Sequence, residues 1–596
     1  MRRLAFAGIL LMALAVSLTG LTWGLPSRRA DRYLFSAQPP WPGQRLVELK
    51  GSDWNRRGAL GADVDIDPLT DRSGPIELTQ ADHRVAEILI RYRLYTHQPD
   101  EPSTLRALAS MRPSQLDFDP KLYQYGGLFI YPVGALIGLC SACGWIEGKH
   151  DLSYWLDHPE AFGRLYVVAR MYSASLGLLG IVACYLLGRR LGGTAGGLLA
   201  AGLFPLLPVV VTMSHEAKPH LGGAVLILLA ALAAVRYVET GRRSCWWGAA
   251  LLSGSAFGMV LSDWTALAVL PVAAWQRPDG DRRQLAKRLA GVFAAAVLVF
   301  LLVNPYLAIN LIAHRDTLRS SLQTSTAMYE VGRVGQGLWN VTRLLIEGTG
   351  PVLGILAVVG CGVLTVSRNR PMWLVLAPAV LTVLQFACIG AGKPGEYGRF
   401  LVYPAAVIAV LAACAVSSAL QRRRTIGALL AAFVIAATAL DTYRYLRGFV
   451  HDACDTNTRS LAARWLSEQL AQDPDADLGI LREPAPYCVP PLDFAGRRVV
   501  LLPPEHPGKV SDWPHYVVST CDDPDDFESS WWRPRYDRVA IFPSNTRGWF
   551  GRPTLISWAD KPVVVFRRKP GDSVPASSST VKQDPRLPVT RPVGGG

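Results

Sequence analysis

The sequence predicts a polytopic α-helical membrane protein with about eleven transmembrane helices and a small C-terminal α/β domain outside the membrane. Half of the residues are hydrophobic and only 18% are charged, whereas a soluble domain usually carries about a quarter charged residues. The apolar residues also form long runs, and a bilayer core of about 30 Å needs roughly 20 such residues as helix. The weak alternation that is typical of a membrane β-barrel is absent from these runs.

The first apolar run, within residues 1–25, predicts a transmembrane signal anchor. It is too long for the apolar part of a cleaved signal peptide, and no clear A-x-A site follows it. Arg2 and Arg3 precede it, so the positive-inside rule places the N-terminus in the cytoplasm.

Five further basic clusters separate the later apolar runs, and all of them can be placed inside together. They are Arg189-Arg190, Arg242-Arg243, Arg282 to Arg288, Arg368 to Arg370 and Arg422 to Arg424. The ten later spans are then predicted at 166–188, 195–213, 220–239, 246–260, 264–276, 288–309, 350–367, 372–390, 400–420 and 425–445. The C-terminal part lies outside. A further apolar stretch, 127–143, is short for a span and is expected to dip into the outer leaflet.

This topology divides the chain into five parts. They are the anchor at 1–25, a large extracytoplasmic loop with surface helices at 26–165, a multi-span membrane domain at 166–445, an extracytoplasmic soluble α/β domain at 446–570 and a disordered tail at 571–596. Within the soluble domain, Arg459 to Leu470 predicts a helix, and four short β-rich runs predict strands. The runs are Val499–Leu502, Tyr516–Ser519, Val539–Phe542 and Val563–Phe566.

Charge and cysteine content exclude several function classes. The net charge of +14 is spread over short clusters between apolar runs, which argues against nucleic-acid binding. Cys140 and Cys143 form one C-x-x-C without a second pair, which does not indicate a metal or redox site. Cys454, Cys488 and Cys521 lie in the outer domain, where a disulfide is possible but its pairing is not fixed by the sequence.

Asp100 and Glu101 are the most informative pair in the first outer loop. Asp100 precedes a predicted helix whose first turn contains Pro102, so it fits the N-cap position. This helix is expected to lie on the membrane surface. One interpretation is that Asp100 is only a cap. The other is that the two adjacent carboxylates form a general base or a metal site.

Tyrosines follow this helix in the stretch 118–132. Tyr123, Tyr125 and Tyr131 suit a belt at the level of the lipid headgroups, and interfacial anchoring alone would explain them.

The order of several motifs resembles the GT-C membrane glycosyltransferases, in particular the protein O-mannosyltransferase and aminoarabinose-transferase group. The resemblance covers roughly residues 1–420. It rests on the acidic pair in the first outer loop, the Tyr-Gly-rich re-entry, Arg170 to Gly177, Tyr185 to Gly192, Ser214 to His220, and Tyr397 to Pro404.

The resemblance implies an enzyme that transfers a hexosyl or pentosyl group from a polyprenyl-phosphate donor. It places the essential acid of the first outer loop at Asp100 or Glu101. The more usual Asp after the third span is replaced by Lys218-Pro219-His220, which puts a second acidic ligand in doubt. It also implies a cell membrane location, in a bacterium the inner membrane, with the active site on the extracytoplasmic face.

Such a reaction needs a base for the acceptor hydroxyl and fixed positive charge for the departing phosphate. We expect Asp100 and Glu101 to be catalytic. The expected phosphate-binding residues on the outer face are Lys218, His220, Lys393 and Arg399, and the expected substrate-binding residues are Tyr123, Tyr125 and Tyr397. Direct displacement would invert the anomeric centre. The sequence does not decide whether a divalent metal takes part, nor which sugar, or which glycan, lipid or protein acceptor, is used.

Other classes of protein remain alternatives. His215 and His220 are five residues apart with Pro219 between them, which does not match a zinc protease. A transporter or flippase of lipid-linked glycans would need charged residues along its spans, and these are nearly free of charge. A polymerase or ligase of surface polysaccharide could use the same donor, but arginines late in the chain, rather than an early acidic pair, would favour it.

Overall fold

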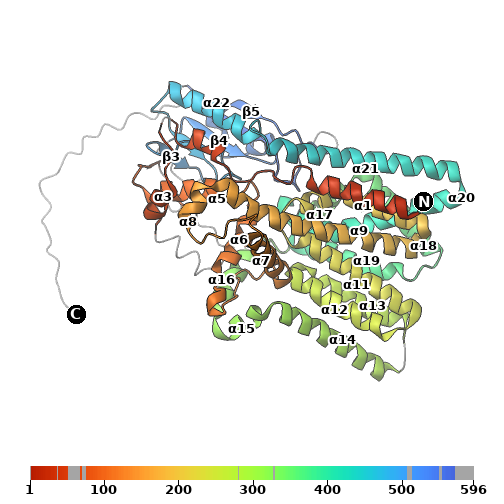
Figure 1. Ribbon diagram of the computed structural model, residues 1–596. Coiled ribbons are helices and arrows are strands. Elements are labelled where there is room, and N and C mark those ends of the chain that lie inside the picture. Colours follow the sequence, from red (N-terminus) through yellow and green to blue (C-terminus); the bar gives the residue numbers. More distant parts are fainter. Residues whose placement is uncertain are drawn as a thin grey trace, which may run out of the picture.

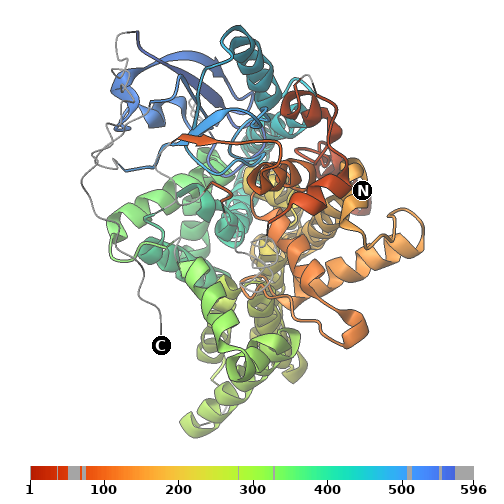
Figure 2. The same cartoon turned by 90° about the vertical axis from the view of Figure 1, so that its left-hand side faces the viewer.

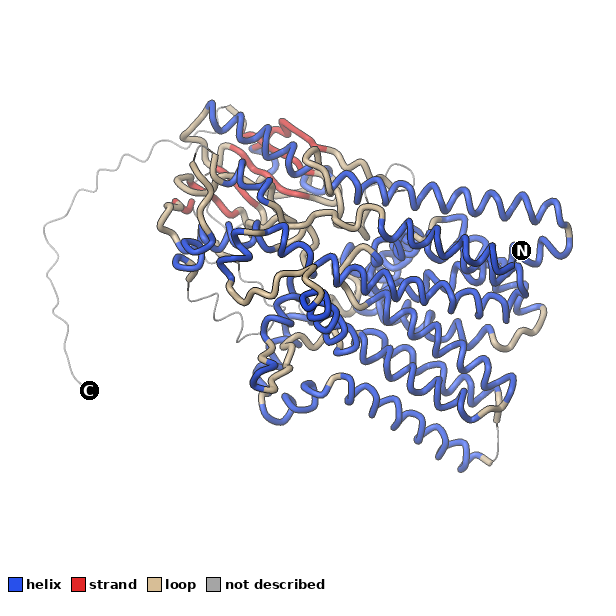
Figure 3. The backbone as a smooth tube through the Cα atoms, viewed as in Figure 1, coloured by secondary structure: helices blue, strands red, loops and turns tan. Residues whose placement is uncertain are grey.

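A computed structural model describes residues 2–36, 38–51, 67–69, 75–278, 281–326, 329–392, 394–505, 513–548 and 554–570. Long helices form a bundle, and a body that contains the β-sheet lies at one end of it (Figures 1 and 3). The N-terminus lies at the opposite end of the bundle from the sheet (Figure 1). The tail at 571–596, predicted to be disordered, is outside the described residues.

Every one of the eleven predicted spans falls on helical segments of the bundle. These are α1 (Arg2–Leu18), α9 (Pro159–Leu203), η3 (Phe204–Leu206), α10 (Pro208–Ser214), α11 (His220–Thr240), α12 (Arg243–Met259), η4 (Leu261–Ala268), α13 (Val269–Gln276), α14 (Arg282–Val303), α18 (Pro351–Val366), α19 (Met372–Ile389), α20 (Val402–Arg422) and α21 (Arg424–Asp452). The bundle also contains α17 (Val334–Thr349), where no span was predicted.

In the described part of the chain, six helices are long and apolar enough to cross a membrane, or seven if the bent pair α17 and α18 counts as one span. The chain bends by 102° between these two helices. Several other predicted spans coincide with shorter elements, such as α1 and α12 with 17 residues each. A multi-span helical membrane architecture is therefore supported, while the count of eleven stays a prediction.

The segment α9 contains a reversal of the chain that was predicted from its basic cluster. Gly192 and Gly193 have non-helical backbone angles, and Gly193 has φ of 71°, which favours glycine. A Cβ on Gly197 would lie 2.7 Å from the carbonyl oxygen of Tyr185. Twelve residues of straight helix would separate those positions by roughly 18 Å, so two antiparallel helices meet here. Arg189 and Arg190 lie beside this turn.

The body with the sheet, called the outer body because the predicted topology places it outside the membrane, is built from the first loop, two helices after α14, the segment before α20, and the C-terminal segment. Its helices are η1 (Arg28–Ala30), α2 (Asp31–Leu34), α3 (Gly43–Leu49), α5 (His83–Leu94), α6 (Glu101–Ser110), η2 (Pro113–Gln115), α7 (Gly127–Ala142), α8 (Leu152–Asp157), α15 (Pro305–Ala313), α16 (Arg315–Thr326), η5 (Pro394–Leu401), α22 (Thr458–Gln472), η6 (Pro524–Phe527) and η7 (Arg533–Arg535). The predicted membrane-dipping stretch is α7, which contains Pro132.

The sheet has six strands in the order β1-β3-β2-β4-β6-β5. Their bounds are β1 (Pro75–Glu77), β2 (Leu478–Ile480), β3 (Arg498–Leu501), β4 (Tyr516–Thr520), β5 (Tyr536–Phe542) and β6 (Val563–Arg568). Strand β2 is parallel to β3 and β4, while β6 runs antiparallel to β4 and β5. The four predicted strands and the predicted helix are present.

The edge strand β1 comes from the first loop and pairs antiparallel with β3, Ile76 opposite Val499. The two outer segments therefore share one sheet, and they lie side by side over the ends of the helices (Figure 2). Leu89 of α5, Leu466 of α22 and Val499 of β3 belong to one apolar core. With only three residues, β1 and β2 are too short for a period-two pattern to reveal them.

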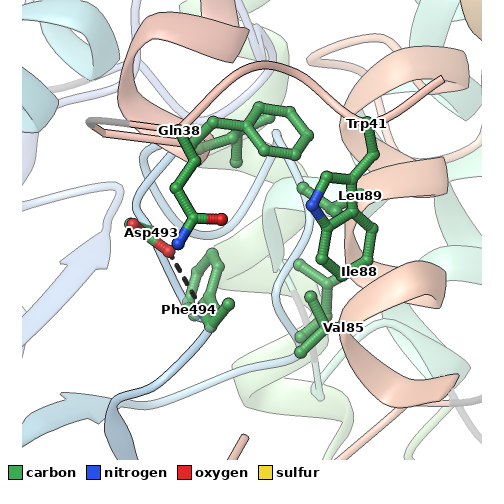
Figure 4. A pocket seen from close by; sticks show the side chains of 10 residues that line it. Gln38, Trp41, Val85, Ile88, Leu89, Asp493 and Phe494 are labelled. Carbon is green, nitrogen blue, oxygen red and sulfur yellow. Dashed lines mark hydrogen bonds between the residues drawn. The ribbon is translucent and has the colours of Figure 1, made fainter. Parts of the chain in front are cut away.

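A small pocket lies in this seam, where Trp41, Ile88 of α5 and Phe494 face one another (Figure 4). Its volume is about 20 Å³, which is enough for about one water molecule. It is a packing feature rather than a substrate site.

The described cysteines are all free thiols. Cys488 is buried, Cys521 half-buried and Cys454 exposed.

Candidate active site

Asp100 occupies the N-cap position of α6 but does not act as a cap. Its side chain makes no capping hydrogen bond, so the interpretation of Asp100 as only a cap is wrong. The two backbone N–H groups at this helix start, those of Asp100 and Glu101, instead donate to Oε1 of Gln98 at 2.6 and 3.0 Å. Because Gln98 caps the helix, the Asp100 carboxylate can bind other groups. The first turns of α6 are buried, contrary to the expected surface helix.

The Asp100 carboxylate lies between two cations from distant segments. Lys218 Nζ is 2.7 Å from Asp100 Oδ2, and the Arg399 guanidinium also donates to Oδ2. Lys218 comes from the turn between α10 and α11, and Arg399 from η5. Burial raises the pKa of Asp100, but the positive charges of Arg399 and Lys218 outweigh it, so that the pKa lies below its ordinary value. Asp100 is therefore an anion held by two positive charges, with its side chain 31% exposed.

Glu101 points the other way, into a buried ion pair with Arg170 of α9. Arg170 donates to both oxygens of Glu101, at 2.8 and 2.7 Å, and both side chains are fully buried. The Ala217 N–H and the Thr96 hydroxyl also donate to this carboxylate, at 2.8 and 2.7 Å. The remaining N–H groups of Arg170 bind the carbonyl oxygens at the end of the anchor segment, those of Leu21 and Trp23. Glu101 thus joins α6 to the anchor and to α9.

Glu216 is a third carboxylate in the same region, and it was not among the expected site residues. Its Oε2 lies 3.2 Å from Lys218 Nζ and accepts a long hydrogen bond, 3.5 Å, from Gln98. Its Oε1 is buried with no hydrogen-bond partner in the described structure. Burial raises the pKa of Glu216 to about 7, although the charge of Lys218 partly opposes the shift. This carboxyl group therefore changes its charge near neutral pH.

Aromatic rings surround the inner side of the Asp100 cluster. The ring of His220 contacts Tyr125 edge-on, with 5.8 Å between centroids, and Phe400 edge-on at 4.9 Å. His220 Nδ1 is buried and has no hydrogen-bond partner among the described residues. Tyr125 is buried near Asp100, whose negative charge adds to the effect of burial in raising the pKa of this phenol.

The structure thus brings together five of the residues expected from the sequence: Asp100, Lys218, His220, Arg399 and Tyr125. Tyr123 instead bonds to Asp119 at 3.2 Å and accepts a hydrogen bond from Asn310 at 2.6 Å. Lys393 lies outside the described residues, and the side chain of Tyr397 is likewise not described.

The open question of a metal can be tested against the residues present. Among the described residues, no group of three His, Cys, Asp or Glu side chains is arranged to hold a metal ion. The oxygens of Asp100 and Glu216 face Lys218, and both oxygens of Glu101 face Arg170. When Glu216 is ionised the charges balance, since three carboxylates then face three cations: Asp100, Glu101, Glu216, Arg170, Lys218 and Arg399. These residues do not fit a divalent cation, because its charge would be uncompensated in a buried site.

A large apolar groove begins at the helix that Asp100 precedes. It has a volume of about 1200 Å³ and is lined by α6, α7, the start of α9 and the start of α15. Pro102, Leu105 and Arg106 belong to its α6 wall, and Tyr306 of α15 also lines it. An elongated apolar ligand can therefore lie along α6 with one end near Asp100.

Arg170 and Glu216 were missed as site residues for different reasons. A lone arginine within the apolar run at 166–188 is costly at membrane depth and indicates a buried partner, so this signal was present. Glu216 had no comparable signal, because it lies in a short polar turn where exposure to solvent is the ordinary expectation.

Comparison with known proteins gives a family match over part of the chain. Residues 160–309 match the family described as dolichyl-phosphate-mannose-protein mannosyltransferase. The resemblance to the GT-C glycosyltransferases of this group is confirmed. An integral membrane enzyme of the glycosyltransferase class is supported as well. Direct comparison with curated proteins finds no match.

Several solved GT-C structures are similar in fold at low identity. ArnT from Cupriavidus metallidurans, bound to undecaprenyl phosphate, has 15% identity and a TM-score of 0.40, covering 81% of this chain and 96% of ArnT. The oligosaccharyltransferase AglB from Archaeoglobus fulgidus in its apo form has 14% identity and a TM-score of 0.42, covering 82% of this chain and 64% of AglB. Likeness at this level carries no argument about the site, which rests on the residues described above.

Proposed function

We propose that this chain transfers a sugar from a polyprenyl-phosphate donor to an acceptor hydroxyl on the extracytoplasmic face of a membrane. The observation that carries the proposal is the Asp100 carboxylate held between Lys218 and Arg399, two residues before Pro102, which lines a large apolar groove. A lipid-phosphate donor has the matching chemistry, namely a long apolar chain and one anionic group. The prenyl chain would occupy the groove and the phosphate would reach the two cations.

The two cations give the site its affinity for phosphate. In the structure the Asp100 carboxylate is the anion that they bind. A donor phosphate would compete for the same N–H groups and draw them away from Asp100. The pKa of Asp100 would then rise toward its ordinary value, and the carboxylate would become a better proton acceptor.

The transfer step is a single displacement. The acceptor oxygen forms a bond to the anomeric carbon while the bond from that carbon to the phosphate oxygen breaks. The electron pair leaves with the polyprenyl phosphate, whose new charge is stabilised by Lys218 and Arg399. Asp100 takes the proton of the acceptor hydroxyl, and the anomeric configuration is inverted. Glu101 holds α6 in place through Arg170 rather than contacting the reacting groups.

A flippase or transporter of the same lipid remains the alternative. It would need ionisable groups along a path through the bundle. The cluster described here is instead confined to the first part of α9, the turn before α11, the start of α6 and η5, which favours the enzyme.

The test is transfer by the purified protein from undecaprenyl-phosphate sugars of defined headgroup, with the products identified by mass spectrometry. We expect a glycosylated acceptor and free undecaprenyl phosphate from the wild type. Asp100→Asn should lower the rate by about 10²- to 10⁴-fold, the usual cost of losing a general base. Near-normal turnover by Asp100→Asn would contradict the assigned role.

A further inference from the structure

Arg399 lies on η5, and the outer face of η5 is covered by a loop of the C-terminal segment, residues 554–560. The closest approach is at Gly398, the residue before Arg399. A Cβ placed on Gly398 would lie only 2.5 Å from Cγ2 of Ile556. No side chain larger than hydrogen fits there unless Ile556 moves. The loop therefore touches the backbone that carries one of the two phosphate-binding cations.

Glu347 of α17 fixes this loop at the same point. Its Oε1 accepts hydrogen bonds from the backbone N–H groups of Leu555 and Ile556, at 2.6 and 3.0 Å. The same oxygen accepts a third hydrogen bond from the Tyr445 hydroxyl of α21, at 3.0 Å. Hydrogen bonds to a charged acceptor are stronger than neutral ones, so one carboxylate ties the loop to two helices of the bundle.

The far end of the loop is anchored separately. Asp560 bonds to His451 of α21 at 2.7 Å and accepts from the Asn545 N–H at 2.6 Å. The Thr458 hydroxyl, at the start of α22, donates to the carbonyl oxygen of Lys561 at 2.7 Å. Residues 554–561 are thus held at both ends against the outer ends of α17 and α21, with Ile556 pressed onto η5.

The inner face of η5 meets the site itself. Phe400 stacks on Phe386 of α19 with 4.5 Å between ring centroids and contacts His220 edge-on. The Arg399 guanidinium lies beside Phe400 and donates to Asp100. The segment is therefore enclosed between the loop on one side and Phe386, His220 and Asp100 on the other.

We propose that the 554–560 loop is a positioning element of the active site, and that Ile556 and Glu347 fix the Arg399 guanidinium where it binds the donor phosphate. The C-terminal segment then contributes to phosphate binding without contacting substrate. This inference rests on the proposed function, because it takes undecaprenyl phosphate as the ligand of Arg399. If the proposal is right, changes at Ile556 or Glu347 alter phosphate binding and not only the stability of the fold.

A size-exchange experiment tests the contact at Gly398. Gly398→Ala adds a methyl group against Ile556, Ile556→Ala removes the obstructing carbons, and the double variant combines both. Gly335→Ala is the matched control, since a Cβ at Gly335 of α17 meets no atom within 4 Å. The measured quantities are the affinity of each detergent-purified full-length protein for undecaprenyl phosphate and its thermal unfolding temperature.

Gly398→Ala should weaken binding of undecaprenyl phosphate by about tenfold or more, the value of a hydrogen bond to a charged group. The unfolding temperature should stay near that of the wild type. Gly398→Ala/Ile556→Ala should recover most of the affinity, and Gly335→Ala should bind like the wild type. A loss of affinity at an unchanged unfolding temperature, reversed in the double variant, is an effect that general destabilisation cannot produce.

Wild-type affinity in Gly398→Ala would overturn the proposal, and so would a loss that Ile556→Ala does not reverse. If Gly398→Ala does not fold, Glu347→Ala decides the matter. Weaker phosphate binding, with Glu347→Gln closer to the wild type, supports the positioning role, and unchanged binding overturns it. Failure of the wild type itself to bind undecaprenyl phosphate would instead overturn the proposed function, and this inference with it.

Discussion

Neutralising Asp100 should remove activity, whereas neutralising the adjacent Glu101 should lower stability. Glu101→Gln keeps the size of the side chain but removes the charge that faces Arg170. Four hydrogen bonds converge on this carboxylate, two of them from the guanidinium, and both members of the pair are fully buried. An amide N–H₂ would then face a guanidinium, leaving a buried positive charge without its counterion.

The expected loss of stability in Glu101→Gln follows from that geometry. Breaking one partner of a buried ion pair costs about 3–5 kcal/mol, because the other charge remains buried. Asp100→Asn should cost far less in stability, since the Asp100 side chain is 31% exposed and its capping task is performed by Gln98. Glu101→Gln should therefore unfold at a clearly lower temperature than the wild type, and Asp100→Asn close to it.

The assay combines thermal unfolding with turnover on the same preparations. A thiol-reactive dye reports unfolding, because Cys184 and Cys488 are buried in the folded protein. The expected pattern is a folded but inactive Asp100→Asn and a destabilised Glu101→Gln that regains activity at low temperature. A Glu101→Gln protein with wild-type stability and no turnover would refute the assignment, because Glu101 would then take part in the chemistry.

Three further outcomes follow from the site. The raised pKa of Glu216, about 7, keeps this side chain protonated below that pH, so its negative charge beside Lys218 appears only above pH 7. The affinity for undecaprenyl phosphate should therefore fall as the pH rises through 7. In binding measurements at pH 6 to 8.5, Glu216→Gln should flatten this pH profile. Treatment with EDTA, followed by metal analysis of the protein, should leave turnover unchanged, because Lys218 and Arg399 already neutralise the carboxylates; restoration of a lost rate by Mn²⁺ or Mg²⁺ would contradict the charge-balance argument. A reporter fused after Lys569 should behave as extracytoplasmic, and cytoplasmic behaviour would disprove the predicted topology.

Hydropathy and basic clusters placed most helices of the bundle, α17 excepted, because a bilayer imposes a length and a polarity on each span. The reversal at Gly192 and Gly193 followed from the same rule. The α/β character of the C-terminal segment was also visible, since β3, β4, β5 and β6 each contain a β-branched run. These features depend on local sequence and on the solvent.

The partners within the site depend on tertiary packing, which local sequence does not encode. Asp100, Lys218 and Arg399 could each be placed on the outer face, but not in contact, since they come from three distant segments. The different contacts of the Asp100 and Glu101 carboxylates could not be predicted, for the same reason. Their opposite directions follow from the Gln98 cap and from Arg170 on another helix.

Because β1 pairs with β3, the outer body cannot complete its sheet until β3 has been synthesised. Residues 75–77 leave the ribosome early, whereas their partners at 498–500 are among the last to be made. At synthesis rates of about 5–20 residues per second, β1 waits roughly 20 to 80 seconds for the strand beside it. During that interval the helices of the bundle are made while the first loop still lacks its partner strand. A chain that stops before β3 would leave this loop permanently incomplete, with an open strand edge available for pairing with other unfinished chains.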